Sequence, residues 1–223
     1  MRYLLVVFLG VVTAQRPAPG SFPCEPRLMR ATGTDMEGPY YKPNSPFGRG
    51  SGNQPTVCSE NLPGTRLYLN GTVMKVTPDQ PCGSPIRALL DVWSADVNGA
   101  YSNIAPESPD FTCRSRFTTD ERGNYAFSSI LPGRYYDSGW RPAHVHWKIT
   151  PIDANGQPVG RTITTQMYFV GDQYRAPNDS CEACNSGDSS MVTHVTQIPG
   201  GGTAGRCRLL AYRPQRMRRL IST

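Results

Sequence analysis

Short hydrophobic runs, separated by turn residues, occupy most of the chain from Thr65 onward. Runs of this length and spacing predict β-strands, and no segment shows the 3.6-residue period of an amphipathic helix. The pattern therefore predicts an all-β fold: an antiparallel β-sandwich with long loops and no large helical domain. The expected strands cover residues 66–70, 72–76, 87–97, 116–119, 125–130, 143–150, 162–170 and 206–212.

Turn residues indicate how two of these strands are connected. Asn155-Gly156 lies between the strands expected at 143–150 and 162–170. A turn of this kind lets the second strand return antiparallel to the first. We therefore expect Gln166 to lie near residues 144–146.

The ends of the chain differ from its middle. The first fourteen residues follow the pattern of a secretory signal peptide, with Arg2, an apolar run over 4–12 and the small residues Thr13-Ala14. The run is too short to span a bilayer and no later run is longer, so we expect secretion and no membrane anchor. The expected segments are a signal peptide at 1–14, an extended arm at 15–64, the sandwich at 65–212 and a basic tail at 213–223.

Composition narrows the possible partners. The chain has 223 residues, a length that suits one all-β domain, and a formal net charge of +6. The basic residues are dispersed until the C-terminal end, and no nucleic-acid recognition motif lies beside them. We therefore expect no nucleic-acid partner.

The seven cysteines predict disulfides, because a secreted protein passes through an oxidising compartment. The odd number leaves at least one free or bonded to another chain, and spacing does not fix the pairing. We expect Cys181 or Cys184 to staple a long loop at 171–205. Cys181-x-x-Cys184 also suits a redox or zinc element, although a zinc ribbon needs a second such pair, which the chain lacks.

His144 and His146 are the first candidates for chemistry. Alternate residues of a strand project from the same face, so both imidazoles can bind one metal ion. The pair alone is a weak signal, because surface or core histidines also occur at this spacing. Nearby tyrosines strengthen it, since two phenolates and one hydroxide would cancel the charge of Fe(III) in a partly buried site. Zinc or copper more often takes a third histidine or a cysteine.

Five sequence blocks resemble the intradiol ring-cleaving dioxygenases, the enzymes that cleave catechol and protocatechuate. The most specific block is Trp140-Arg-Pro-Ala-His-Val-His146, and the others follow the family's order over roughly residues 35 to 175. The other blocks are Glu37-Gly-Pro-Tyr-Tyr41, Asp91-Val-Trp93 through Tyr101, Pro132-Gly-Arg-Tyr135 and Thr165-Gln-Met-Tyr-Phe169.

The resemblance implies a β-sandwich with a mononuclear non-haem Fe(III). It implies Tyr101, Tyr135, His144 and His146 as the iron ligands. Tyr135 is preferred over its neighbour Tyr136 because adjacent residues of an extended chain point to opposite faces.

The resemblance also implies residues that contact the substrate. Arg141 would stabilise negative charge on the catecholate under attack by O2, because a guanidinium is always charged and planar. Gln166 would line the site, and Glu37 and Tyr40 would form part of its mouth. The product would be a muconate, formed by cleavage between the two hydroxyl-bearing carbons.

The segment before residue 65 lacks the helical domain through which the catechol enzymes dimerise, so the resemblance implies a monomer with a rather open site. One alternative is a non-catalytic secreted sandwich of transthyretin-like type that binds phenolics. Another is an Fe(II) enzyme with two histidines and a carboxylate, for which Asp137 is the nearest candidate. His194 is more readily a loop histidine than a further ligand.

Overall fold

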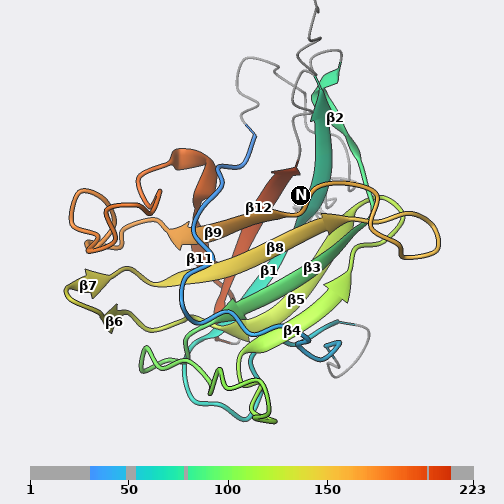
Figure 1. Ribbon diagram of the computed structural model, residues 1–223. Coiled ribbons are helices and arrows are strands. Elements are labelled where there is room, and N and C mark those ends of the chain that lie inside the picture. Colours follow the sequence, from blue (N-terminus) through green and yellow to red (C-terminus); the bar gives the residue numbers. More distant parts are fainter. Residues whose placement is uncertain (1–30, 49–53, 78–79, 200, 212–223) are drawn as a thin grey trace, which may run out of the picture.

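The computed structural model describes residues 31–48, 54–77, 80–199 and 201–211. Within these residues the chain forms a sandwich of two five-stranded sheets, with no α-helix (Figure 1). The predicted fold class is therefore confirmed. The expected signal peptide and basic tail lie outside the described residues.

One sheet carries the strand order β11-β12-β1-β2, with β5 also paired to β1. Its strands are β1 (Arg66–Thr77), β2 (Gln80–Pro85), β5 (Asn124–Ile130), β11 (Val195–Gln197) and β12 (Thr203–Ala211). The second sheet carries the order β10-β9-β8-β3-β4. Its strands are β3 (Ala88–Ser94), β4 (Arg114–Thr118), β8 (His144–Pro151), β9 (Ile163–Phe169) and β10 (Val192–Thr193).

A separate two-stranded hairpin joins β6 (Tyr135–Tyr136) to β7 (Trp140–Arg141), and a 3-10 helix spans Ser189–Met191. The hairpin extends beyond the end of the second sheet, beside β8 (Figure 1). These short elements, with β10 and β11, were not predicted, because two or three residues are too few to show a periodicity.

Two strand pairings depart from a purely antiparallel arrangement. Strand β12 runs parallel to β1, and β10 runs parallel to β9. The predicted break at Gly71 does not occur, because Gly71 pairs with Tyr125 on one edge of β1 and with Cys207 on the other. Hydrogen bonding on both edges keeps this glycine extended.

Strand β8 faces the core on one side and the site on the other. Val145, Trp147 and Ile149 are buried between the sheets, where Trp147 packs against Tyr125 and Phe127 with ring centroids 5.5 and 5.4 Å away. The alternate residues His144 and His146 point away from this core, because side chains of a strand alternate between its faces.

The arm covers the site face of the second sheet, as the blue segment in Figure 1 shows. The amide of Asp35 donates to Thr164 O of β9, and the amide of Gly48 donates to Arg116 O of β4, at 3.0 and 2.8 Å. The segment between these two contacts therefore crosses β8, which carries His144 and His146, and its neighbour β3.

Disulfides join some of these segments. Cys58 is bonded to Cys113, which ties the arm to the loop before β4, and Cys181 is bonded to Cys184. The latter bond lies within the loop at 171–205 and closes a local turn of four residues, so the expected cross-link of this loop joins Cys181 to Cys184. Cys82 is also disulfide-bonded, and Cys24 lies outside the described residues.

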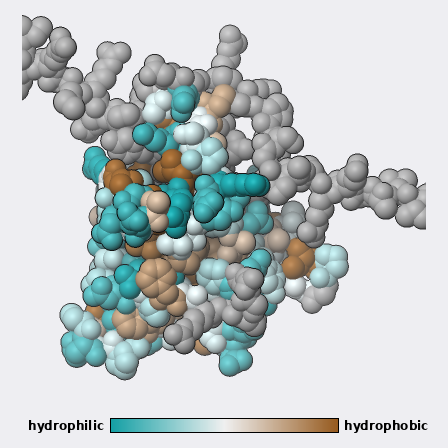
Figure 2. Space-filling view, turned by 90° about the vertical axis from the view of Figure 1, so that its right-hand side faces the viewer, coloured by the Kyte–Doolittle hydropathy of each residue, from teal (hydrophilic) through white to brown (hydrophobic). Residues whose placement is uncertain are grey.

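The face shown in Figure 2 mixes hydrophilic and hydrophobic residues, with the hydrophobic ones in small groups. In the part of the chain that the structure describes, no helix has the length and hydropathy needed to cross a bilayer.

Candidate metal centre

His144 and His146 direct their Nε2 atoms at one point. The two Nε2 atoms are 3.0 Å apart, and both imidazoles are buried. His144 is oriented by its Nδ1, which lies 2.7 Å from Pro142 O. His146 is held by Trp93 of β3, whose ring stacks on the imidazole at 4.7 Å with an interplanar angle of 5°.

Tyr101 brings the third donor atom to this point from the loop after β3. Its hydroxyl lies 3.3 Å from His144 Nε2 and 3.1 Å from His146 Nε2. The turn before Tyr101 is closed by Asp96, whose Oδ1 accepts the amides of Asn98 and Ala100. The fixed turn sets the direction in which the tyrosine leaves β3.

Tyr135 reaches the same centre from β6. Its ring lies edge-on to Tyr101 at 5.6 Å and tilted against His144 at 5.7 Å. Tyr136 points the other way, with 69 % of its surface exposed, and packs against Trp140. Tyr135 therefore faces the site, and Tyr136 lies on the solvent-exposed face of the hairpin.

This donor set fits a cation. Only one nitrogen of a neutral imidazole carries a hydrogen, and the carbonyl beside His144 Nδ1 places it there. The Nε2 atom of His144 is therefore a free lone pair that faces the His146 nitrogen and the Tyr101 oxygen. Two neutral imidazoles with two phenol oxygens suit ferric iron, because two phenolates would offset most of its charge in a buried site.

Burial sets the electrostatics of these four groups. It lowers the pKa of His144 to about 3 and that of His146 well below its ordinary value, so both remain neutral ligands. Burial also raises the pKa of Tyr101 well above 10, and it raises that of Tyr135. A phenolate at either position therefore needs a positive charge at the centre to stabilise it.

Arg141 lies beside this centre on β7, opposite Tyr135 in the hairpin. Its NH1 donates to Tyr135 Oη at 3.2 Å, and its NH2 donates to Gln166 Oε1 at 3.4 Å. Its Nε donates to Asp179 Oδ1 at 2.8 Å. Arg141 is a buried residue, and three partners thus fix the plane of its guanidinium.

Gln166 lies where the predicted antiparallel return places it. It pairs with His146 in the β8–β9 ladder, and its Nε2 donates to Met36 O of the arm at 2.9 Å. The hydroxyl of the buried Tyr168 lies 2.9 Å from Gln166 Oε1 and 2.9 Å from Asp35. The amide is therefore oriented from both the arm and β9.

The arm residues differ in what they contact. Tyr40 stacks on Tyr101, whereas Glu37 forms an ion pair with Lys148 of β8. Tyr41 packs on Trp93 at 4.9 Å and donates a hydrogen bond to Asp91. Glu37 and Tyr40 were both predicted to border the site. In the structure Tyr40 contacts the candidate ligand Tyr101, whereas Glu37 contacts the ammonium of Lys148.

Two other candidates lie away from the centre. His194 is exposed between β10 and β11, and Asp137 is exposed in the β6–β7 turn. Over residues 31–48, 54–77, 80–199 and 201–211, no group of three His, Cys, Asp or Glu side chains is placed to hold a metal. The carboxylate that the Fe(II) alternative requires is therefore missing from the described residues.

Sequence reasoning missed Lys42 and Asp179. Lys42 donates from a buried ammonium to three carbonyls of the loop that carries Tyr101, those of Asn103, Ser108 and Asp110. Asp179 is 38 residues from its partner Arg141. No local pattern marks either residue, since their partners are distant in the sequence.

Comparisons with known proteins agree with this geometry. A family model described as "Dioxygenase" matches residues 36–208. A chlorocatechol 1,2-dioxygenase of Rhodococcus opacus is 34% identical over 75% of this chain and 66% of its own length. A catechol 1,2-dioxygenase of Candida albicans is 30% identical over 75% of this chain and 55% of its own. The chain thus spans about half to two thirds of the length of these relatives.

One solved structure is matched over almost its whole length. The dioxygenase domain of a dioxygenase and carbohydrate-binding protein fusion from Streptomyces sp. SirexAA-E superposes with a TM-score of 0.61 and 29% identity. The match covers 82% of this chain and 98% of that one, so the described sandwich corresponds to a whole dioxygenase domain.

Proposed function

Because the chain belongs to the intradiol ring-cleavage dioxygenase family, we propose that it is a secreted Fe(III) enzyme that cleaves catechol-type rings with O2. Cleavage falls between the two hydroxyl-bearing carbons and gives a muconate. The observation that carries the proposal is the convergence of the Tyr101 hydroxyl and the Nε2 atoms of His144 and His146 within 3.3 Å of one another. Tyr135 completes the ligand set.

Secretion is proposed from the sequence pattern of the first fourteen residues. The disulfides of the sandwich suit an oxidising compartment. We propose a monomer as the acting form, as the resemblance implies.

Ferric iron, when bound, supplies Lewis acidity that stabilises a coordinated catecholate and makes its ring reactive towards O2. The four ligands are Tyr101, Tyr135, His144 and His146. Their two phenol groups provide the anionic charge that a trivalent ion requires in a buried site.

Tyr135 is the ligand suited to take up a substrate proton. Tyr40 meets its ring edge-on, whereas Tyr101 is stacked on Tyr40 and its hydroxyl lies 3.1 Å from His146 Nε2. Arg141 NH1 donates to Tyr135 Oη, which steadies the oxygen in either protonation state. A catechol hydroxyl can therefore pass its proton to Tyr135 Oη.

Arg141 orients and stabilises the substrate. A guanidinium has five N–H groups, and three of these are directed at Asp179, Tyr135 and Gln166. One hydrogen remains on NH1 and one on NH2, beside the centre where the catechol oxygens would lie. Fixed donors at this position stabilise negative charge that develops on the ring during attack by O2.

The test is an anaerobic visible spectrum of the purified protein before and after addition of catechol. We expect a tyrosinate-to-iron charge-transfer band that moves to longer wavelength with catechol, and a muconate when air is admitted. A protein that stays colourless and iron-free after reconstitution with iron would overturn the proposal and favour non-catalytic binding of phenolics.

A further inference from the structure

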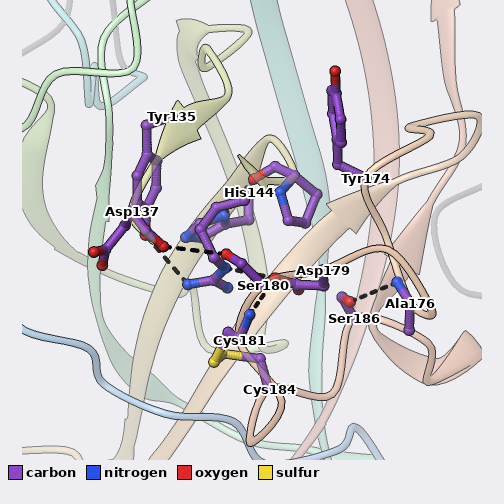
Figure 3. A network of polar contacts seen from close by, with 12 residues as sticks. Tyr135, Asp137, His144, Tyr174, Ala176, Asp179, Ser180, Cys181, Cys184 and Ser186 are labelled. Atoms are coloured by element: carbon purple, nitrogen blue, oxygen red, sulfur yellow. Dashed lines mark hydrogen bonds and ion pairs between the residues drawn. A yellow bond between two sulfur atoms is a disulfide. The ribbon is translucent and has the colours of Figure 1, made fainter. Parts of the chain in front are cut away.

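We propose that Asp179 is a positioning residue that fixes Arg141 for the reaction, and that the turn closed by the Cys181–Cys184 disulfide holds Asp179 in place. The inference rests on the proposed function, because it assigns a role relative to the guanidinium that faces the substrate. Figure 3 shows Asp179, Cys181 and Cys184 grouped beside His144 and Tyr135.

The contact between Arg141 and Asp179 determines where the guanidinium points. Arg141 Nε donates to Asp179 Oδ1 at 2.8 Å, and the two side chains are 10% and 3% exposed. A guanidinium is rigid and planar, so a fixed Nε direction also fixes NH1 and NH2. These two nitrogens then face Tyr135 and Gln166.

Asp179 is itself held by the residues that follow it. The amide of Cys181 donates to the same Oδ1 atom at 3.0 Å, so one carboxylate oxygen joins the turn to the guanidinium. The disulfide to Cys184 and a hydrogen bond from the Cys184 amide to Cys181 O close this turn.

The loop is also attached to the hairpin that carries Arg141. The amide of Ser180 donates to Trp140 O at 3.1 Å, and its hydroxyl lies 3.4 Å from Asp137 O (Figure 3). The backbone of Gly139 approaches so closely that a Cβ atom there would lie 2.6 Å from Ser180 Cβ. Asp179 and Arg141 are therefore held by one contiguous unit.

Hydrogen bonds also join the two ends of the segment from Arg175 to Ser186, which contains Asp179. Arg175 Nε donates to Ser186 O at 2.9 Å, and the amide of Ala176 donates to Ser186 Oγ at 3.0 Å. Ser186 is fully buried. The segment that presents Asp179 is thus held at both ends.

Stability alone is a poor explanation for this ion pair. Burying two charges costs desolvation energy that their attraction often fails to recover. Asp179 Oδ2 is also buried and has no hydrogen-bond partner among the described residues, which adds to the cost. A role in orienting the Arg141 guanidinium towards the substrate explains this costly ion pair better than stability does.

The chain offers a matched control. Arg134 forms an ion pair with Asp172, also 38 residues apart, and its side chain is 45% exposed. Asp172 begins the same loop that contains Asp179. Arg134→Gln therefore removes an arginine–aspartate pair from this loop without touching Arg141.

The first experiment is a double-mutant cycle on kcat/KM with Asp179→Ala and Arg141→Ala. We expect Asp179→Ala to lower kcat/KM about 10- to 100-fold while iron content and the charge-transfer band are retained. The same substitution should cost nothing further in the Arg141→Ala protein, since a positioning residue acts only through its partner. Equal losses in both backgrounds would show that Asp179 acts independently and would overturn the proposal.

Two more variants extend the cycle. Asp179→Asn keeps an acceptor for the Cys181 amide, so it serves if Asp179→Ala does not fold, and it should show the same dependence on Arg141. Replacing both Cys181 and Cys184 by serine should lower kcat/KM by a smaller factor, again only when Arg141 is present. Arg134→Gln should leave kcat/KM and the dependence on Arg141 unchanged.

A second experiment needs no metal. Mass spectrometry after treatment with an arginine-specific dicarbonyl reagent reports whether each guanidinium is free. Arg141 should be protected in the wild type and in Arg134→Gln, and modified in Asp179→Ala. Equal protection of Arg141 in all three proteins would overturn the positioning role even if the protein proved inactive on catechols. An active wild type with additive losses would remove this inference and leave the proposed function intact.

Discussion

Tyr40 lies parallel to Tyr101, with ring centroids 4.5 Å apart and an interplanar angle of 10°. The same ring meets Tyr135 edge-on at 6.0 Å. One residue of the arm therefore contacts both phenol groups of the candidate metal centre. The arm is thus part of the site as well as a cover for the sheet.

Replacing Tyr40 by leucine should weaken the hold on iron. An aromatic pair contributes about 0.5–1.5 kcal/mol beyond its buried area, so we expect up to about tenfold faster iron loss to a chelator. Tyr40→Phe keeps the ring and should match the wild type. A Tyr40→Phe protein that loses iron as fast as Tyr40→Leu would show that the hydroxyl matters and the stacking does not.

Lys42 should be needed to order the loop that carries Tyr101. Lys42 is 1% exposed. Its ammonium lies 4.3 Å from the Phe111 ring centroid and donates to the carbonyls of Asn103, Ser108 and Asp110. Lys42→Met leaves three carbonyls without this donor and should cost on the order of 3 kcal/mol in the free energy of unfolding.

Urea denaturation measures that loss, and limited proteolysis should show new cleavage within residues 102–112. Arg161→Met, at an exposed position in the loop before β9, is the control and should change neither result. Resistance of the Lys42→Met loop to protease would contradict the role assigned to this ammonium.

Tyr135→Phe should shift or abolish the charge-transfer band, because it removes one of the two phenolate ligands. Tyr136→Phe should barely change the spectrum, since Tyr136 lies on the exposed face of the hairpin. The two variants differ from the wild type by the same atom at adjacent positions, so they control for each other. The reverse pattern would assign the ligand to Tyr136.

Much of the site could be predicted because its residues are close in the sequence or lie at strand spacing. The shared face of His144 and His146 follows from the two-residue alternation of β8. The place of Gln166 follows from the Asn155-Gly156 turn, and the opposite directions of Tyr135 and Tyr136 follow from their adjacency. The structure agrees with each of these expectations.

The rest depends on contacts that no local pattern encodes. Lys42 meets carbonyls 61 to 68 residues away, and Asp179 meets Arg141 across 38 residues. The parallel pairing of β12 with β1 joins positions more than 130 residues apart, such as Leu67 and Thr203. Such contacts are set by tertiary packing, which hydrophobic periodicity does not describe.

The stability of the metal-free protein should fall in mild acid because of His144. Burial is the largest cause of the drop in its pKa from an ordinary 6.5 to about 3 in the folded protein. Between these values the unfolded chain binds a proton that the folded state excludes, so the free energy of unfolding falls as pH falls. His146, whose pKa is also lowered, acts in the same direction.

Urea denaturation of the metal-free wild type and of His144→Gln at roughly pH 7 and pH 5 tests this dependence. Glutamine can still donate to Pro142 O but does not titrate, so the variant should lose less stability on acidification. Asp35 and Asp91 have a raised pKa through burial and act in the opposite direction. Both remain in the two proteins, so the difference between them isolates His144. An equal loss in wild type and variant would show that protonation of this imidazole does not limit acid stability.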